Sequence, residues 1–190
     1  MSIRIERSAS VIVCSNDSRR YHEEMVAGIY LQEIAEQFAK LGFEAILIGN
    51  AAAAIQGAPV TTIDIDFLFR DTPSNVAKLK KLAKSLDMEI FNPLYPASQM
   101  FRLMRDSDTL QLDFRVRIRG IRKYESLRSR ATLVSFGDKQ LLVASMADII
   151  KSKRAAGRPK DLAVLVTLEE VYAKIQAREK AKAHQPKEAV

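Results

Sequence analysis

The fold of this chain is decided by residues 49–70, GNAAAAIQGAPVTTIDIDFLFR, which end in a strand-like alternation of polar and apolar side chains. Alternate residues of a β-strand share a face, so Asp64 and Asp66 are predicted to point the same way. Thr62 and Leu68 belong to the same face. The opposite face, which we expect to anchor the strand in a core, comprises Ile63, Ile65, Phe67 and Phe69.

Two carboxylates so close together repel each other, and a cation, basic side chains or solvent must neutralise them. Mg²⁺ suits such a pair because it is a hard ion that is often held by one or two carboxylates plus substrate phosphates. The alternative is that Asp64 and Asp66 line an exposed sheet face or pair with Arg115 and Arg117. The Asp-x-Asp spacing is common, and taken alone it favours this alternative.

A second alternation, from Thr109 to Ile118, predicts another strand with one polar face. Its apolar positions are Leu110, Leu112, Phe114, Val116 and Ile118, and its polar positions are Gln111, Asp113, Arg115 and Arg117. Asp113 would therefore be a third carboxylate on a polar sheet face. Three such carboxylates can hold two Mg²⁺ ions about 3.5 to 4 Å apart, which supports in-line phosphoryl transfer. Mn²⁺ is an alternative ion.

Helices and further strands flank these two segments. Apolar spacing and capping residues predict helices at about 19–41, 49–57, 71–86, 121–129, 145–156 and 160–182. Shorter apolar runs predict strands at 43–48, 88–91, 100–104, 131–136 and 140–143. The chain is therefore predicted to be an α+β protein with a mixed β-sheet, flanking helices and a C-terminal helical portion. We expect an N-terminal arm (1–18), an α+β core (19–144), the C-terminal helical portion (145–182) and a disordered tail (183–190).

Composition bounds the class of protein. The chain has 190 residues, 47% hydrophobic and 28% charged, which fits one main globular domain. It contains neither an apolar run long enough to cross a bilayer nor an apolar stretch at its start, so we expect a cytoplasmic protein without membrane contact. Cys14 is the only cysteine, and His22 and His184 are far apart, which argues against a disulfide or a zinc cluster. Any metal would be held by oxygen.

The net charge of +7 favours polyanionic partners such as nucleic acid or nucleotide phosphates. Part of the excess lies in the last helix, where solvated charge needs no partner. A more specific basic stretch begins on the strand that carries Asp113. It comprises Arg115, Arg117, Arg119, Arg122, Lys123, Arg128 and Arg130.

The chain resembles the nucleotidyltransferase superfamily, the fold shared with DNA polymerase beta. The resemblance lies in a strand, a Gly-led turn, a short helix, a Thr two residues before Asp-x-Asp and a later third Asp. Closest are small prokaryotic members related to abortive-infection and toxin–antitoxin systems. The resemblance implies that Gly49 and Asn50 hold the triphosphate of an NTP such as ATP and that Asp64, Asp66 and Asp113 bind Mg²⁺. It implies transfer of an NMP to a hydroxyl. Free backbone N–H groups at a helix start also favour anions.

The similarity continues in residues 145–161, SMADIIKSKRAAGRPKD, which resemble a segment of these proteins in which a helix with a Lys precedes an Arg-x-Lys-Asp turn near the nucleotide. Lys151 or Lys153, together with Arg158 and Lys160, are then candidate triphosphate contacts that Asp161 orients. The alternative is a helix hairpin in which Asp161 caps the last helix and the basic side chains are solvated.

Two departures from the family pattern bear on function. Asn50 stands where Gly or Ser is usual, and replaces a hydroxyl with an amide that can still donate. Val60 stands where relatives often have Arg, which keeps open a non-catalytic nucleic-acid or partner-binding module. For an enzyme, RNA or tRNA is favoured as acceptor over a small molecule such as an aminoglycoside, and a protein hydroxyl stays open. An antitoxin partner is a further expectation.

Overall fold

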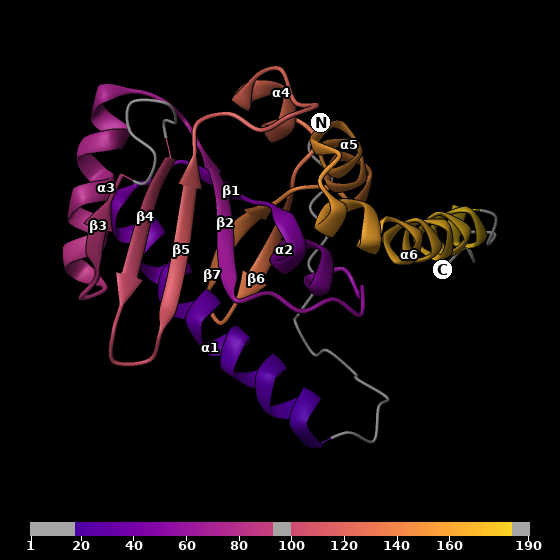
Figure 1. Ribbon diagram of the computed structural model, residues 1–190, viewed down its shortest axis with the longest axis horizontal. Coiled ribbons are helices and arrows are strands. Elements are labelled where there is room, and N and C mark those ends of the chain that lie inside the picture. Colours follow the sequence, from indigo (N-terminus) through magenta and orange to yellow (C-terminus); the bar gives the residue numbers. More distant parts are fainter. Residues whose placement is uncertain (1–17, 93–99, 184–190) are drawn as a thin grey trace, which may run out of the picture.

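Seven strands form one mixed sheet in the part of the chain that the computed structural model describes, residues 18–92 and 100–183 (Figure 1). They are β1 (Ala45–Leu47), β2 (Asp64–Phe69), β3 (Glu89–Phe91), β4 (Met100–Arg105), β5 (Leu110–Arg115), β6 (Thr132–Phe136) and β7 (Lys139–Val143). Their order across the sheet is β3-β4-β5-β2-β1-β7-β6. β2 pairs with β5 and β1 with β7 in parallel, and the other pairs are antiparallel. The predicted α+β fold with a mixed sheet is confirmed.

The helices of the described residues are α1 (Ser18–Leu41), α2 (Gly49–Ile55), α3 (Pro73–Ser85), α4 (Tyr124–Arg128), α5 (Met146–Ala156) and α6 (Pro159–Ala183). Their ends follow the local sequence. Thr72 accepts a hydrogen bond from the N–H of Asn75 at the start of α3, and Pro73 is the first helical residue. Gly157, with φ of +65°, ends α5 in the left-handed conformation that glycine tolerates best.

The core lies between α1 and one face of the sheet. Phe38 of α1 is 5.1 Å from Phe67 of β2, ring centre to ring centre, and Phe67 stacks on Phe114 of β5 at 5.2 Å. Phe67 and Phe114 are completely buried. Because side chains alternate along a strand, burying these phenylalanines turns Asp66 and Asp113 to the opposite face of the sheet.

Several predicted boundaries are wrong in detail. Ile63, expected to anchor the strand, is 96% exposed, because β2 begins only at Asp64, where pairing with β5 starts. The predicted strand 109–118 pairs only from Leu110 to Arg115. The strand predicted at 43–48 is reduced to the three residues of β1. The predicted arm, the tail and the Asn92–Gln99 loop fall almost entirely outside the described residues.

The C-terminal helices adjoin the core through α2. The side chain of Gln56, just after α2, donates to the carbonyl of Ala144 and accepts from the N–H of Met146, both at 3.0 Å. These bonds join α2 to the start of α5. The division into a core and a C-terminal helical portion stays a prediction. Within residues 18–92 and 100–183, none of the helices combines the length and apolar character that crossing a bilayer requires.

Candidate active site

The parallel pairing of β2 with β5 brings the three predicted carboxylates together. Asp66 lies directly opposite Asp113 across the two strands, and Asp64 lies opposite Gln111. One carboxylate oxygen from each of Asp64, Asp66 and Asp113 lies within 4.8 Å of the other two. Such a set of hard oxygen donors fits a divalent cation such as Mg²⁺. The three aspartates can therefore hold a metal ion.

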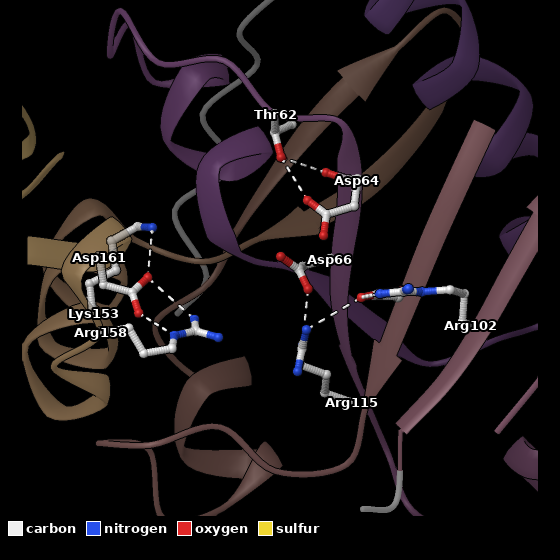
Figure 2. Close-up of polar contacts among 9 residues, drawn as sticks. Thr62, Asp64, Asp66, Arg102, Arg115, Lys153, Arg158 and Asp161 are labelled. Carbon is white, nitrogen blue, oxygen red and sulfur yellow. Dashed lines mark hydrogen bonds and ion pairs between the residues drawn. The ribbon is translucent and has the colours of Figure 1, made fainter. Parts of the chain in front are cut away.

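Two arginines already neutralise part of this charge (Figure 2). Arg102 of β4 lies opposite Asp113 and donates from Nε to Oδ1 at 2.7 Å and from Nη2 to Oδ2 at 2.8 Å. Arg115 bridges the two strands, because it donates to Asp66 Oδ1 at 3.0 Å and to Asp113 Oδ2 at 3.3 Å. The alternative that the aspartates pair with Arg115 is thus confirmed for Asp66, whereas Arg117 forms no ion pair with the described residues.

Asp66 has a raised pKa because it is partly buried beside two other carboxylates. Removal from water raises the pKa of Asp66, and the nearby charges of Asp64 and Asp113 raise it further, while Arg115 lowers it in part. The net shift of the Asp66 pKa is upward. An added cation at this position would relieve the repulsion that Arg115 leaves uncompensated.

Gly49 lies so close to the Asp66 side chain that it has no room for a side chain of its own. It starts α2 with φ of +69°, and a Cβ built on it would lie 2.8 Å from Oδ2 of Asp66. That separation is shorter than real Cβ contacts allow, so any side chain here would displace the carboxylate. The first turn of α2 therefore touches the candidate metal site, and the predicted contact of this turn with a triphosphate stays a prediction.

The side chain of Asn50 forms a hydrogen bond that the sequence did not indicate. Its Nδ2 donates to the carbonyl of Thr61 at 3.1 Å, which ties the start of α2 to the segment before β2. Thr62 follows and donates from its hydroxyl to Oδ1 of Asp64 at 2.9 Å. Oδ1 of Asn50 is buried with no hydrogen-bond partner among the described residues. One N–H of the Asn50 side-chain amide therefore donates to the loop before β2 and not to a ligand.

Of the predicted cations of the α5–α6 junction, Lys153 and Arg158 contact Asp161. This buried carboxylate accepts from Arg158 Nε at 2.5 Å and from Lys153 Nζ at 3.4 Å. Burial raises the pKa of Asp161, but Arg158 and Lys153 together outweigh burial and bring it below its usual value. Asp161 lies inside the first turn of α6, as its third residue, and orients both cations.

Arg158 also interacts electrostatically with the aspartates of the sheet. Its pKa is raised first by its hydrogen bond to Asp161, and the charges of Asp66 and Asp64 raise it further. In Figure 2, Lys153, Arg158 and Asp161 form a group to the left of Asp66, and the side chain of Arg158 extends toward Asp66. Lys160 is exposed and makes no ion pair with the described residues. Arg158 is therefore the link between the α5–α6 junction and the carboxylates.

Arg102 is the site residue that sequence reasoning missed. Its strand, MFRLMR, shows no clean alternation, and only the antiparallel register with β5 reveals that Arg102 opposes Asp113. A signal was available: Arg102 is a charge in the middle of an apolar strand, where an unpaired cation would be costly.

Comparison with solved structures shows the fold. The antibiotic-resistance factor ANT(2'')-Ia is similar with a TM-score of 0.51 and 14% identity, over 84% of this chain and 96% of that one. An antigenic nucleotidyltransferase-like protein from Paracoccidioides brasiliensis has a TM-score of 0.49 and 16% identity, over 83% and 90% of the two chains. JHP933 from Helicobacter pylori has a TM-score of 0.47 and 16% identity, over 80% and 66%.

No protein-family model matches the sequence, and no curated protein matches it. The mixed sheet and the likeness to ANT(2'')-Ia confirm the predicted nucleotidyltransferase fold. At these sequence identities the similarity shows the fold alone, and the chemistry must be inferred from the residues of the site.

Proposed function

We propose that this protein is an Mg²⁺-dependent nucleotidyltransferase that moves an NMP from an NTP to a hydroxyl acceptor. One observation carries the proposal: in a nucleotidyltransferase fold, Asp64, Asp66 and Asp113 place carboxylate oxygens within 4.8 Å of one another on the polar face of the sheet. An acidic cluster has an electrostatic cost that a bound cation would offset, and the family resemblance implies that these three aspartates bind Mg²⁺.

The reaction forms a bond between the acceptor oxygen and the α-phosphorus. It breaks the bond from that phosphorus to the bridging oxygen, and pyrophosphate leaves. The acceptor proton passes to a base, a step in which Asp113 is proposed to assist. Mg²⁺, held by the three aspartates as one or two ions, supplies positive charge that stabilises the phosphoryl oxygens; Mn²⁺ can replace it.

The remaining residues bind and orient the triphosphate. Arg158 is the best-placed cation, because it is anchored by Asp161 and senses Asp64 and Asp66. Lys153 shares the same anchor, and Lys160 extends the positive charge at the start of α6. Gly49 and Asn50 are proposed to present backbone N–H groups to the β/γ-phosphates, since the Asn50 side chain is engaged with Thr61.

The test is incubation of purified protein with each α-³²P-labelled NTP and Mg²⁺, followed by a denaturing gel. Separate samples contain total RNA, protein alone or an aminoglycoside. Label that appears on one acceptor and disappears in Asp64→Asn/Asp66→Asn supports transfer and identifies the acceptor class. Asp87→Asn is a matched control, because Asp87 is exposed and its positive φ of 52° suits Asn. Absence of label with every NTP, in Mg²⁺ and in Mn²⁺, contradicts the proposal.

One observation favours a second candidate, a non-catalytic binding module. Arg102 and Arg115 neutralise Asp113 and Asp66 in part without any metal ion. Calorimetric titration with MgCl₂ separates the two candidates. Binding that Asp64→Asn abolishes favours the enzyme, and unchanged partner binding without Mg²⁺ affinity favours the module. A toxin-like role with an antitoxin partner belongs to the proposal through the family resemblance, and a cytoplasmic location belongs to it through the hydropathy pattern of the sequence.

A further inference from the structure

The structure divides the basic stretch 115–130 into two groups. Arg115 is occupied by Asp66 and Asp113, and Arg130 donates to the buried carboxylate of Asp148 at 2.7 Å. The other members of the stretch are exposed to solvent: Arg117, Arg119, Arg122, Lys123 and Arg128. The paired arginines serve the fold and the site, and the exposed ones are left for a partner.

The segment that carries these exposed cations packs on α5, which comes from a distant part of the sequence. The segment that follows β5 packs on α5, because a Cβ on Gly120 would lie 2.9 Å from the carbonyl oxygen of Lys151 and 3.0 Å from Cβ of Ala155. Arg119 donates to the carbonyl of Ala156 at 3.3 Å. Figure 1 shows the segment between β5 and α4 at the same end of the sheet as α5. Two stretches some thirty residues apart are thereby joined.

We call the joined region the basic surface and define it by six exposed cations that form no ion pair with the described residues: Arg117, Arg119, Arg122, Lys123, Lys151 and Lys160. The carboxylates that could offset it are committed elsewhere. Asp148 and Asp161 are buried and paired with Arg130 and Arg158. Glu125 pairs with Arg70. The basic surface is therefore a region of net positive charge, which Asp148 offsets in part at Lys151.

The basic surface is connected to the candidate active site through the chain at two places. Arg117 comes two residues after Arg115, which contacts Asp66. Lys160 comes two residues after Arg158, which senses Asp64 and Asp66. A chain of anions lying along the surface would therefore reach the carboxylates at one of its hydroxyl groups.

We infer that the basic surface binds the phosphate backbone of a nucleic-acid strand, and that a hydroxyl of this strand is the acceptor. Cations that are spread over a surface match the repeating charge of a nucleic acid, and backbone contacts position the strand without a need for base recognition. The inference rests on the proposed function for the role of the hydroxyl. The binding itself does not require catalysis, so the two can be tested apart.

The experiment measures binding of a fluorescein-labelled 20-nucleotide RNA by anisotropy, in EDTA and without NTP, at several salt concentrations. The test variant is Arg122→Glu/Lys123→Glu. The matched control is Lys80→Glu/Lys81→Glu, which makes the same charge change at exposed positions of α3, a helix that lies beside β3 and away from α5 (Figure 1). Circular dichroism melts of both variants verify folding, and Arg122→Gln/Lys123→Gln replaces the test variant if it unfolds.

We expect the test variant to lower RNA affinity at least tenfold and the control to lower it less than twofold. The slope of log K against log salt should fall by about 1.5 in the test variant, because each lost phosphate contact removes about 0.7 to 0.9. A DNA oligonucleotide of the same sequence is compared in parallel. Equal sensitivity of RNA and DNA assigns the surface to the backbone that they share, and sensitivity of RNA alone adds recognition of the 2′-hydroxyl.

Equal losses in the two variants would overturn the inference, because total charge and not this surface would then govern binding. No loss in either variant would also overturn it, because the basic surface would then not contribute to binding. Tight binding of poly-glutamate with the same sensitivity to the variants would also overturn it, since phosphate would not be distinguished from carboxylate. Asp64→Asn should still bind RNA. If that variant binds RNA and wild type transfers no nucleotide, the surface stands while the proposed function fails.

Discussion

Arg102 and Asp113 face each other across β4 and β5 and share two hydrogen bonds, at 2.7 and 2.8 Å. The Asp113 side chain is completely buried, whereas that of Arg102 is 30% exposed. A buried carboxylate that loses its partner keeps its desolvation cost without compensation. Arg102 therefore compensates the desolvation of the Asp113 carboxylate in the sheet.

We expect Arg102→Met to lower the free energy of unfolding by about 2 to 4 kcal/mol, near the range for breaking a buried pair, because Arg115 compensates only part of the loss. Urea denaturation measures the change. Arg154→Met is the control, since Arg154 pairs at 2.7 Å with the exposed Glu169 and such pairs contribute at most about 1 kcal/mol. Equal effects of the two substitutions would contradict the role assigned to Arg102.

Gly49→Ala should reduce Mg²⁺ affinity as well as stability. The new Cβ would lie 2.8 Å from Oδ2 of Asp66, and a positive φ costs a non-glycine residue about 1 to 2 kcal/mol. Gly42→Ala is the matched control, because Gly42 has a similar φ of +57° and its Cβ would meet only the tip of Lys78, at 3.5 Å. Calorimetry should show weaker Mg²⁺ binding in Gly49→Ala alone; an equal change in both variants would count against contact with the metal site.

Arg115→Met should make the protein more dependent on Mg²⁺ for its stability. Arg115 is the cation that Asp66 and Asp113 share, so its loss leaves more repulsion for a metal ion to relieve. We expect a lower melting temperature in EDTA than for wild type, and a larger rise of the melting temperature on addition of MgCl₂. A smaller rise than in wild type would show that Arg115 assists the ion and does not compete with it.

The pair of Asp148 and Arg130 predicts a specific pH dependence. Burial raises the pKa of Asp148, but the hydrogen bonds from Arg130 and Ser145 outweigh burial, so its pKa lies below the usual value. A lowered folded-state pKa contributes stability that is present above the unfolded value of about 3.9 and is lost as the pH falls through the folded value. Asp148→Asn should therefore cost about 2 kcal/mol at pH 6 and progressively less at lower pH.

Urea titrations between pH 6 and pH 2.5 check this prediction for wild type and Asp148→Asn. Asp87→Asn is the control, because Asp87 is exposed and forms no ion pair with the described residues. Its stability should follow that of wild type at every pH. A cost of Asp148→Asn that stays constant down to pH 2.5 would exclude ionisation of Asp148 as the cause.

Much of the site could be predicted because strand alternation is a local property. The alternation around Asp64, Asp66 and Asp113 assigned all three to polar faces, and the structure places them on one face. Local rules also predicted the start of α3 at Thr72 and Pro73. The same local rule was wrong for Ile63, because alternation cannot tell where pairing with a neighbouring strand begins.

The rest depends on register and on contacts between distant segments, which no local pattern contains. Arg102 joins the site only because β4 pairs with β5 so that it opposes Asp113. The bond from Asn50 to Thr61 depends on the path of the chain between α2 and β2. The packing of Gly120 on Lys151, which creates the basic surface, depends on the placement of α5.

The place of β1 has a consequence for how the chain acquires its fold. This three-residue strand, wholly buried, lies between β2, which follows it closely, and β7, which ends about a hundred residues later. During synthesis, therefore, β1 keeps an open hydrogen-bonding edge until β7 has emerged from the ribosome. Sheets with such long-range parallel pairing fold slowly and expose an edge that can aggregate. The folding of this protein is completed from its C-terminal third, however early the strands that carry the aspartates are made.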